Sequence, residues 1–415
     1  MLVLGAGLQG SACAYDLLQT SDVRDVRLCD VNVAQLPAFL APYTDPAHVG
    51  AGHPRLIPTP FDARDGEAVR ALMRGADAVM SALPYYFNFE MARAAAEVGV
   101  HFCDLGGNTE IVEQQRTLAP RMIAQGKSIV PDCGLAPGMV NILAQYGIDL
   151  LEQDGARVTS VRIFVGGLPQ QPEPPLNYQI VYSLEGVLDY YTTRSWVVRN
   201  GERTQVDALS EVERVDIPGV GELEAFHTAG GLSTMATRYE GRIPTMEYKT
   251  LRYPGHAHVM EAVRALGFLE LDPVEVKGQR VVPRDLAVAV MGPRLRKSAA
   301  QDLVAVRVIV EGERDQPDDS PEPVVRAWEL VDHYDVERGV SAMMRATGYS
   351  LSITAQLQAR GEIQPGVWTP DECIPAERYI AELARRGVVI RETSAERRVT
   401  IPDRREVDDR RTISA

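Results

Sequence analysis

The 415-residue sequence has few cysteines, and it lacks three features that would each indicate a particular class of protein. Its five cysteines never stand at C-x-x-C spacing, so neither a disulfide framework nor a structural zinc site is expected. The formal net charge of −14 leaves no basic stripe for nucleic acid. No positively charged leader and no long uncharged apolar run are present, so we expect neither a signal peptide nor a membrane span. These absences predict a cytoplasmic protein without nucleic-acid, membrane or metal partners.

Strand and helix patterns alternate through residues 1–133. Short apolar runs such as "MLVLGAG" and "ADAVMSALP" are interspersed with helical patterns such as "GSACAYDLLQT" and "NFEMARAAAEVG". Strands that alternate with helices indicate βαβ units. We therefore predict an α/β protein whose first domain is a Rossmann-type, doubly wound parallel sheet.

A different pattern begins at residue 134. Apolar and polar residues alternate in "RVTSVRIFVGG", "DLVAVRVIVEGER" and "PVVRAWELVDHYD", and the polar loop "DQPDDSPEP" suits a hairpin connection between the last two. Residues 134–340 are predicted to form a second α/β domain with a mixed or antiparallel sheet, which binds the substrate. Such strands would leave an apolar face or an open edge, so we expect a homodimer or homotetramer. Residues 341–392 are predicted to be helical, and residues 393–415 a frayed polar tail.

The opening stretch "GAGLQG" has the spacing of a dinucleotide-binding loop. Gly5 would permit the turn, Gly7 would let a pyrophosphate approach the backbone, and Gly10 would allow the helix to pack closely on the strand. The helix that begins at Leu8 and Gln9 would direct its free N–H groups toward the phosphates. The alternative is a glycine turn without a ligand.

Acidic residues in the right places extend this hypothesis to the ribose and the adenine. Asp30 lies twenty residues after Gly10 at the end of the second predicted strand, where its carboxylate can accept hydrogen bonds from the ribose hydroxyls. Asn32 follows it, and no Arg or Lys in "DVNVAQL" would meet a 2′-phosphate, so NAD is favoured over NADP. Asp62 could reach the adenine or be an exposed loop acid. Leu83 and Pro84 could flank the nicotinamide ribose or simply end a strand.

Two later stretches, "VPDCGLAPGMVNILAQYG" and "EYKTLRYPGHAHVMEAV", are more particular. Together with "VHFCDLGG", "GYSLSITAQLQARGEI" and the glycine motif, they resemble the saccharopine dehydrogenase-like family, and within it the lysine 6-dehydrogenase branch. The resemblance implies NAD-dependent oxidation of a side-chain amine, carboxy-terminal helices that pack on the first domain, and an oligomer. Ala136 stands where saccharopine reductases typically carry the acid of "GLDPG", which favours the lysine branch.

Four residues are candidates for this chemistry. Asp104 would bind the amine and serve as a base, or it caps the following "GGNTE" turn. Arg252 and Lys249 would bind the substrate's α-carboxylate, or they form a solvated face. His256 could accept a proton, or it is a turn residue.

The sequence thus predicts oxidative deamination of L-lysine to its 6-semialdehyde with release of ammonia. Two alternatives stay open. One is a reductase that joins an aldehyde and an amine, such as saccharopine or carboxynorspermidine dehydrogenase. The other is an NAD-binding homologue without turnover.

Overall fold

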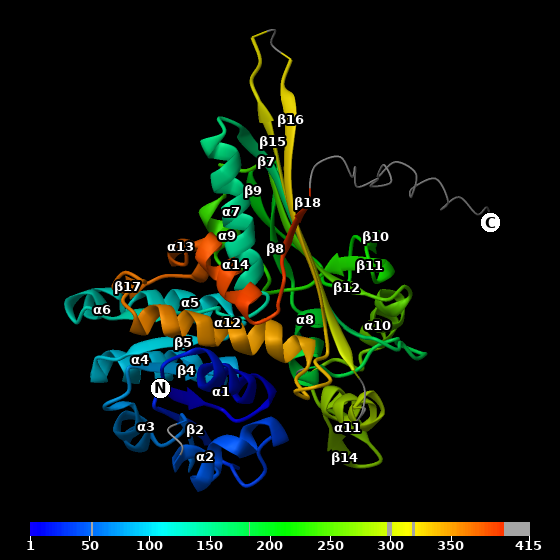
Figure 1. The fold of residues 1–415 in the computed structure, drawn as a ribbon. Helices are drawn as coiled ribbons and strands as arrows, with labels where there is room; N and C mark the ends of the chain where they lie inside the picture. The colour runs from blue at the N-terminus through cyan, green and yellow to red at the C-terminus, as the bar shows by residue number, and fades with distance from the viewer. Residues whose placement is uncertain (51–52, 182, 297–300, 318–319, 394–415) are drawn as a thin grey trace.

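The computed structural model describes residues 1–50, 53–181, 183–296, 301–317 and 320–393. They form two domains, each built on its own large sheet, with the long carboxy-terminal helix α12 (Ala342–Ala359) lying against both (Figure 1). The predicted polar tail lies outside the described residues from position 394 onward.

The first sheet is entirely parallel, with the strand order β17-β6-β5-β4-β1-β2-β3. Its six amino-terminal strands have the order of a dinucleotide-binding fold, so the predicted doubly wound sheet is confirmed. A seventh strand from the carboxy-terminal region extends the sheet, which the sequence did not lead us to expect. The strands are β1 (Leu2–Leu4), β2 (Asp25–Asp30), β3 (Arg55–Pro60), β4 (Ala78–Ser81), β5 (His101–Asp104), β6 (Ser128–Val130) and β17 (Gly366–Val367).

Polar side chains cap the starts of two helices in the first domain. The Asp65 carboxylate accepts hydrogen bonds from two backbone N–H groups at the start of α3, and the Asn108 side chain does the same for one N–H of α5. Gly99, with φ 82°, ends α4 in the left-handed conformation. The helices are α1 (Leu8–Thr20), α2 (Pro46–Gly50), α3 (Gly66–Met73), α4 (Asn88–Val98), α5 (Thr109–Arg116) and α6 (Ala119–Ala124), with the 3₁₀ turns η1 (Ala38–Thr44) and η2 (Tyr85–Phe87).

The second sheet has nine strands and is mixed, as predicted. Its main path is β10-β11-β12-β7-β15-β16-β18; β8 pairs with β12, and β9 with β8. Only the β12–β7 pair is parallel among the pairs that the described residues form in this sheet. The strands are β7 (Arg157–Pro169), β8 (Ser195–Arg199), β9 (Glu202–Val206), β10 (Glu213–Ile217), β11 (Gly221–His227), β12 (Thr245–Arg252), β15 (Asp302–Arg314), β16 (Glu322–His333) and β18 (Arg391–Thr393).

Helices pack on this sheet and on one another: α7 (Met139–Gln153) lies against β7, β15 and β16, and α11 (Pro283–Leu295) lies against α8 (Leu184–Thr192). The short pair β13 (Val274–Val276) and β14 (Gln279–Val281) forms a separate ribbon beside them. The helices are α7 (Met139–Gln153), α8 (Leu184–Thr192), α9 (Met235–Arg238), α10 (His256–Ala265), α11 (Pro283–Leu295), α13 (Pro370–Cys373) and α14 (Ala376–Arg385).

Helix α12 joins the two domains, because it packs on α1, β4 and β5 of the first sheet and on β15 of the second. Its approach to α1 requires a glycine: a Cβ on Gly348 would lie 2.7 Å from the Gln9 carbonyl oxygen. The buried Gln358 amide donates to the carbonyl oxygens of Phe102 and Ser128 at 2.9 and 3.0 Å. One continuous hydrophobic core therefore runs from the first sheet into the second.

The long strands β7 and β15 lie inside the second sheet rather than at its edge, contrary to the reasoning from which an oligomer was expected. β18 covers part of β16 by pairing with residues 327–329. The homo-oligomer thus stays a prediction.

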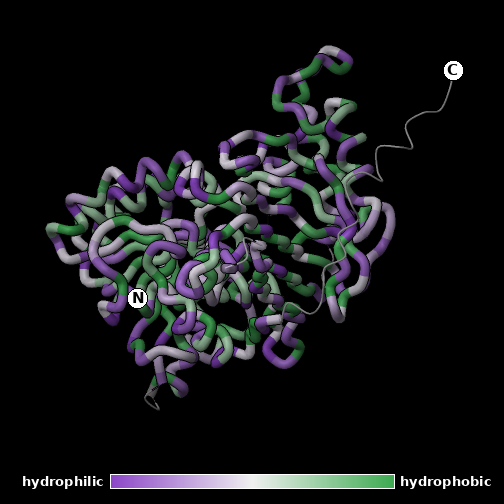
Figure 2. The backbone as a smooth tube through the Cα atoms, turned by 90° about the horizontal axis from the view of Figure 1, so that it is seen from above, coloured by the Kyte–Doolittle hydropathy of each residue, from purple (hydrophilic) through white to green (hydrophobic). Residues whose placement is uncertain are grey.

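Hydrophobic and hydrophilic residues alternate at short intervals along the chain (Figure 2). None of the described helices is long and apolar enough to cross a membrane.

Candidate functional site

The glycine loop between β1 and α1 has the geometry of a phosphate-binding turn. Gly5 has φ 96°, and a Cβ there would lie 2.8 Å from the Ala82 carbonyl oxygen. A Cβ on Gly10 would lie 1.8 Å from the Gly5 carbonyl oxygen, so only glycine lets the helix start so close to the strand. Gly7, in contrast, has no heavy atom within 4 Å of a built Cβ among the described residues. The loop is closed where it packs and open where a ligand would approach.

The residues that follow fit a bound dinucleotide. No described side chain caps α1, so a ligand that approaches the open side of Gly7 could accept hydrogen bonds from its first N–H groups. The Gln9 amide is buried, and neither its nitrogen nor its oxygen forms a hydrogen bond within the described part of the chain. Such groups ordinarily have partners, so a polar ligand at this helix start would satisfy them.

A cavity of about 610 Å³ opens next to this loop, between the two domains. Gly7, Leu8 and Gln9 line it, as do Leu83 and Pro84 beyond β4. The ends of β5 and β6 contribute Leu105–Gly107 and Gly134–Pro137. The carboxyl ends of the parallel strands thus converge on one cavity, where open α/β sheets bind their ligands.

Asp30 lies outside that cavity, at the end of β2. Its carboxylate accepts hydrogen bonds from the Ala6 N–H at 2.7 Å and the Asn32 N–H at 3.0 Å, which tie it to the glycine loop. Asp62 follows β3, next to β2, and forms a two-pronged ion pair with Arg64. Hydrogen bonds from Arg64 lower the pKa of Asp62 to about 2. Asp62 thus has a protein partner, and its expected contact with adenine stays a prediction.

Strand β12 divides the predicted substrate residues between its two faces. Tyr248, Thr250 and Arg252 line the cavity, two residues apart from one another. Lys249 lies three residues before Arg252, and alternate residues of a strand point to opposite sides. The Lys249 ammonium accordingly contacts the Glu211 carbonyl oxygen and Glu213 Oε1, each at 2.7 Å, away from the cavity. The structure thus places Arg252 at the candidate site and Lys249 behind it.

The Arg252 guanidinium rests on a group of aromatic side chains. It lies over the Tyr178 ring, 4.8 Å from the centroid, and hydrogen-bonds to the Tyr191 hydroxyl. The Tyr191 hydroxyl is 2.9 Å from His256 Nε2, and His256 Nδ1 is 3.0 Å from the Leu176 carbonyl oxygen. Because that carbonyl accepts the Nδ1 proton, Nε2 is left to accept from Tyr191. Burial, and then Arg252, lower the pKa of His256 to about 3.

His256 therefore has a different place from the one expected. It is buried below Arg252 and does not line the cavity. Its neutral ring orients Tyr191 and, through it, Arg252. The geometry supports a positioning role rather than proton transfer to a substrate.

Asp104 is fully buried beneath the cavity floor. Its carboxylate accepts hydrogen bonds from Asn88 at 3.0 Å, Gln115 at 2.7 Å and the Gly106 N–H at 2.7 Å. Burial raises its pKa to about 6. This matches the alternative in which Asp104 holds the turn after β5, and it departs from the expectation of an amine-binding base.

A second buried carboxylate holds the same turn. Asp132 has φ 62° and accepts from the Gly107 N–H at 3.3 Å and from the Ser233 hydroxyl. Burial raises the pKa of Asp132 to about 7, and the charge of Asp104 contributes. Two adjacent amides of the cavity floor are thus each fixed by a separate carboxylate.

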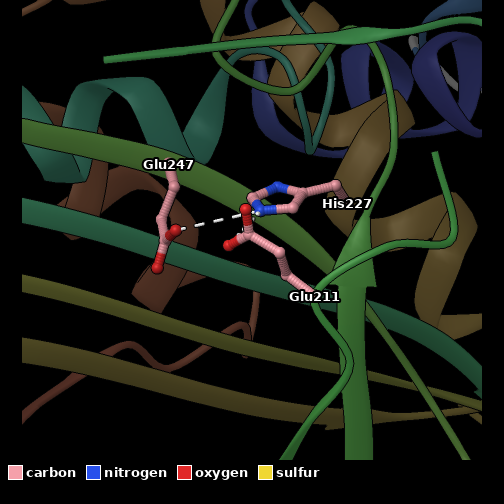
Figure 3. A group of neighbouring side chains, drawn as sticks. All are labelled: Glu211, His227 and Glu247. Carbon is pink, nitrogen blue, oxygen red and sulfur yellow. Dashed lines mark ion pairs between the residues drawn. The ribbon is translucent and has the colours of Figure 1, made fainter. Parts of the chain in front are cut away.

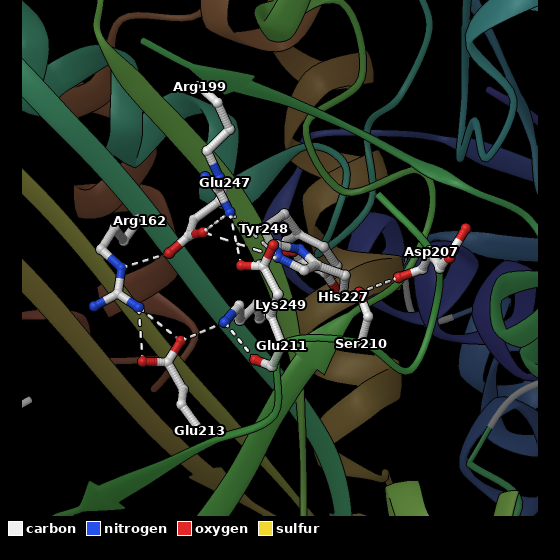
Figure 4. Close-up of polar contacts among 10 residues, drawn as sticks. All are labelled: Arg162, Arg199, Asp207, Ser210, Glu211, Glu213, His227, Glu247, Tyr248 and Lys249. Atoms are coloured by element: carbon white, nitrogen blue, oxygen red, sulfur yellow. Dashed lines mark hydrogen bonds and ion pairs between the residues drawn. The ribbon is translucent and has the colours of Figure 1, made fainter. Parts of the chain in front are cut away.

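Behind β12 lies a network of paired charges (Figure 4). Arg162 bridges Glu247, at 2.6 Å, and Glu213, at 2.6 and 2.8 Å. Arg199 contacts Glu247 and Glu211. Burial opposes ionisation of Glu247, but the surrounding cations prevail and lower its pKa to about 2. This network anchors the strands that carry the cavity residues.

Three members of the network, Glu211, His227 and Glu247, present ligand atoms within 4.8 Å of one another (Figure 3). One Arg199 nitrogen lies 3.1 Å from Glu211 Oε2 and 3.4 Å from His227 Nε2, and it also contacts Glu247 Oε2. The guanidinium thus stands among the atoms that would ligate a metal and supplies the cation that they require.

Sequence reasoning missed the contribution of α8. This helix places Glu185, Asp189 and Tyr190 along the cavity. A Cβ on Gly107 would lie 3.4 Å from the Tyr190 hydroxyl oxygen, which brings that hydroxyl to the end of β5. The only local signal was the (i, i+4) spacing of the two acids in "SLEGVLDYY".

Comparisons with known proteins agree with this architecture. Residues 1–130 match the family model for the saccharopine dehydrogenase NADP binding domain, and residues 134–388 match that for the saccharopine dehydrogenase C-terminal domain. The chain is 23% identical over 314 residues to the NADP-dependent, L-glutamate-forming saccharopine dehydrogenase of Saccharomyces cerevisiae, which covers 74% of this chain and 66% of that enzyme. The chain spans still less, 22% and 47%, of two further curated relatives.

Another relative is matched over almost its whole length. Carboxyaminopropylagmatine dehydrogenase of Synechocystis is 22% identical over 414 residues, or 94% of this chain and 96% of that enzyme.

Solved structures share the fold. Apo saccharopine dehydrogenase from Saccharomyces cerevisiae superposes with a TM-score of 0.73 at 20% identity, over 94% of this chain and 98% of that one. Homospermidine synthase of Legionella pneumophila, in complex with NAD, gives 0.65 at 10% identity, over 95% and 91%. The two family models together account for both domains. The chain belongs to the saccharopine dehydrogenase family.

Proposed function

We propose that this chain is an NAD-dependent oxidoreductase that deaminates the side-chain amine of L-lysine to its 6-semialdehyde and releases ammonia. One observation carries the proposal: Arg252 and the dinucleotide loop line the same cavity. A guanidinium there suits a substrate with a carboxylate, because its fork matches the two carboxylate oxygens.

The charge of the cavity favours a substrate with one carboxylate. Arg252 is the single Lys, Arg or His among the described residues that line it, and Glu185 and Asp189 are the acids. Saccharopine carries three carboxylates, which this lining would hold poorly. Ala136, also in the lining, replaces the acid of the saccharopine reductase turn.

Strand β12 runs along the cavity, so a substrate whose carboxylate is held by Arg252 could react at a carbon far from that carboxylate. Tyr248 and Arg252 are four residues apart, which corresponds to about 13 Å of strand. Tyr190, beside Gly107, approaches the cavity near the ends of β4 and β5, where the nicotinamide would lie. A carboxylate on Arg252 would leave the far end of the side chain to reach the cofactor.

The residues then have distinct tasks. When bound, the nicotinamide supplies the hydride acceptor, and Gly7 with the start of α1 would hold its pyrophosphate. Arg252 orients the substrate, while Asp104 and Asp132 keep the cavity floor in place. Loss of hydride from the neutral amine gives an iminium, which water hydrolyses to aldehyde and ammonia.

A second candidate is a reductase that joins an aldehyde and an amine. The nearly full-length match to carboxyaminopropylagmatine dehydrogenase favours it. A carboxyalkyl polyamine also carries one carboxylate and several cations, so it has the same charge requirements.

Cofactor preference rests on Asp30 and Arg64. The Asp30 carboxylate disfavours a 2′-phosphate, and the charge of Arg64, at the end of the adjacent strand, is already compensated by Asp62. NAD is therefore proposed, although the yeast relative is named for NADP. Titration with NADH and NADPH tests this, and tighter binding of NADPH would contradict it.

The reaction is tested by reduced-cofactor formation across lysine, ornithine, cadaverine and carboxynorspermidine, with ammonia measured in parallel. Lysine turnover with one ammonia per NADH supports deamination. Turnover of carboxynorspermidine without ammonia supports the second candidate. Cofactor binding without turnover of any amine would contradict both.

A further inference from the structure

The cavity carries charge on two elements of the second domain. Arg252 lies at the end of β12, and Glu185 and Asp189 lie on α8. The two acids are four residues apart on the helix and hence share a face. They nevertheless differ in their surroundings.

Asp189 already has an ionic partner within the protein. Its carboxylate pairs with Arg284, which is held in turn by the Thr192 hydroxyl at 2.9 Å and the Leu269 carbonyl oxygen at 3.1 Å. The negative charge of Asp189 is thus compensated from outside the cavity.

Glu185 is different. Its side chain forms no ion pair or hydrogen bond with any other described residue, and it lines the cavity in the first turn of α8. Glu185 stands six residues before Tyr191, which contacts Arg252; six residues correspond to about 9 Å along the helix. The cavity therefore offers a carboxylate at some distance from its guanidinium.

We propose that Glu185 binds a protonated nitrogen of the substrate that is not the reacting amine. The substrate class is then a compound with one carboxylate, held by Arg252, and a second, cationic nitrogen held by Glu185. That nitrogen is either the α-ammonium of a diamino acid or a remote ammonium of a carboxyalkyl polyamine. The inference rests on the proposed function, since it takes the cavity as the substrate site.

The test is Glu185→Gln, which removes the charge and keeps the shape. Glu67→Gln is the matched control, because Glu67 is likewise an exposed acid in the first turn of a helix, α3, but lies outside the cavity. Lysine and 6-aminohexanoate differ only in the α-ammonium, and carboxynorspermidine carries the remote cation.

Loss of Glu185 should raise KM about tenfold for whichever substrate carries the recognised nitrogen, as expected for a hydrogen bond between charged groups. The KM for 6-aminohexanoate should change less than about twofold, because this compound has no second nitrogen for Glu185 to bind. A loss with lysine identifies the α-ammonium; a loss confined to carboxynorspermidine identifies the remote one. Glu67→Gln should leave the KM of each of these compounds unchanged.

Equal effects of Glu185→Gln on lysine, 6-aminohexanoate and carboxynorspermidine, or no effect on any of them, would overturn the inference. Calorimetric titration of the same compounds into NADH-loaded protein separates it from the reaction. If no amine is turned over but Glu185→Gln still weakens only the compounds with a second cation, the proposed reaction fails and the inference stands. If binding also fails to discriminate, both fail.

Discussion

The two faces of strand β12 both carry charged residues, but the surroundings of these residues differ. On one face, Glu247 and Lys249 belong to a network in which each charge has an opposite charge at hydrogen-bond distance. On the other face, Arg252 is held by an aromatic ring, a hydroxyl and a backbone carbonyl at the wall of a cavity. One strand thus separates a buried network of paired charges from a charge that lines the cavity.

The difference follows from the cost of burial. A buried ion requires compensation, and removing one partner of a buried pair leaves the other uncompensated. Behind β12 the compensation comes entirely from the protein. At Arg252, an aromatic ring, a hydroxyl and a backbone carbonyl orient the guanidinium at the cavity wall, where its fork matches the geometry of a carboxylate. Variants on the two faces should therefore fail in different ways.

The largest effect is expected behind β12. Glu247→Gln leaves Arg162 and Arg199 with less compensation in a buried site, which should lower the free energy of unfolding by about 3–5 kcal/mol. Urea unfolding measures it. The control is Glu222→Gln, which breaks the exposed Arg214–Glu222 pair on β10 and β11 and should cost less than about 1 kcal/mol. Equal costs for the two variants would show that the network does not stabilise the fold.

The same carboxylate predicts the response to acid. The pKa of Glu247 is about 2 in the folded chain, below the usual value of about 4.3 in an unfolded one. The unfolded state then binds more protons between these values, so the contribution of Glu247 is complete above about pH 4.3 and is lost as the pH falls toward 2. The stability gap between the wild type and Glu247→Gln should narrow over this range. A gap that stays constant would contradict the lowered pKa.

Arg252 and Lys249 offer the sharpest comparison, three residues apart on one strand. Arg252→Ala should lower kcat/KM for lysine by about one to two powers of ten, because a charged hydrogen bond is worth about 1.5–3 kcal/mol. Turnover of cadaverine, which has no carboxylate, should hardly change. Lys249→Met should instead lower the melting temperature and leave the ratio of lysine to cadaverine activity as it was. Steady-state rates with both amines and a thermal melt of each variant decide between these outcomes.

Cofactor binding supplies the control for that comparison. The dinucleotide loop is in the other domain, so NADH affinity should be the same in both variants. If Arg252→Ala weakens NADH binding, or damages lysine and cadaverine turnover equally, Arg252 supports the fold and the substrate does not contact it.

The sequence predicted the parallel sheet, the glycine loop and the mixed second sheet, because each depends on a local pattern. It also contained the information that separates Lys249 from Arg252. Strand alternation places residues three apart on opposite faces, and treating both as substrate ligands overlooked that rule. The chemistry of its guanidinium was the reason for predicting Arg252 as a carboxylate ligand, and the structure places Arg252 in the cavity wall.

Other residues could not be placed from local patterns. Asp104 ends a parallel strand like a ligand-binding acid, but Asn88 and Gln115, both distant in sequence, occupy its oxygens. His256 follows a Pro-Gly turn, which is typical of an exposed residue. In the structure, Tyr191 and the Leu176 carbonyl, both remote in sequence, hydrogen-bond to its ring. The helix α8 enters the cavity only because the second domain folds over the first. Long-range packing decided all three.

The smallest effect is expected from the support beneath Arg252. Tyr191→Phe removes the hydroxyl that links Arg252 to His256, so the guanidinium should keep its charge but lose its fixed direction. The lost Tyr191–Arg252 hydrogen bond is worth about 1.5–3 kcal/mol, but the substrate does not contact this hydroxyl, so only part of that energy should appear in substrate binding. We expect KM for lysine to rise roughly fivefold while KM for cadaverine stays the same. Steady-state kinetics with the two amines measures this difference.

His256 variants show whether the ring acts through Tyr191 or exchanges protons itself. His256→Gln keeps an acceptor for Tyr191 and a donor for Leu176, so it should preserve most of the lysine KM; His256→Leu keeps neither and should resemble Tyr191→Phe. Because burial and Arg252 hold the pKa of His256 at about 3, the ring stays neutral over the range of about pH 5–8 in which an unperturbed histidine changes charge. The kcat profile of the wild type should therefore contain no inflection that His256→Gln removes. An inflection that disappears in this variant would make His256 the base and would leave Tyr191 as simple packing.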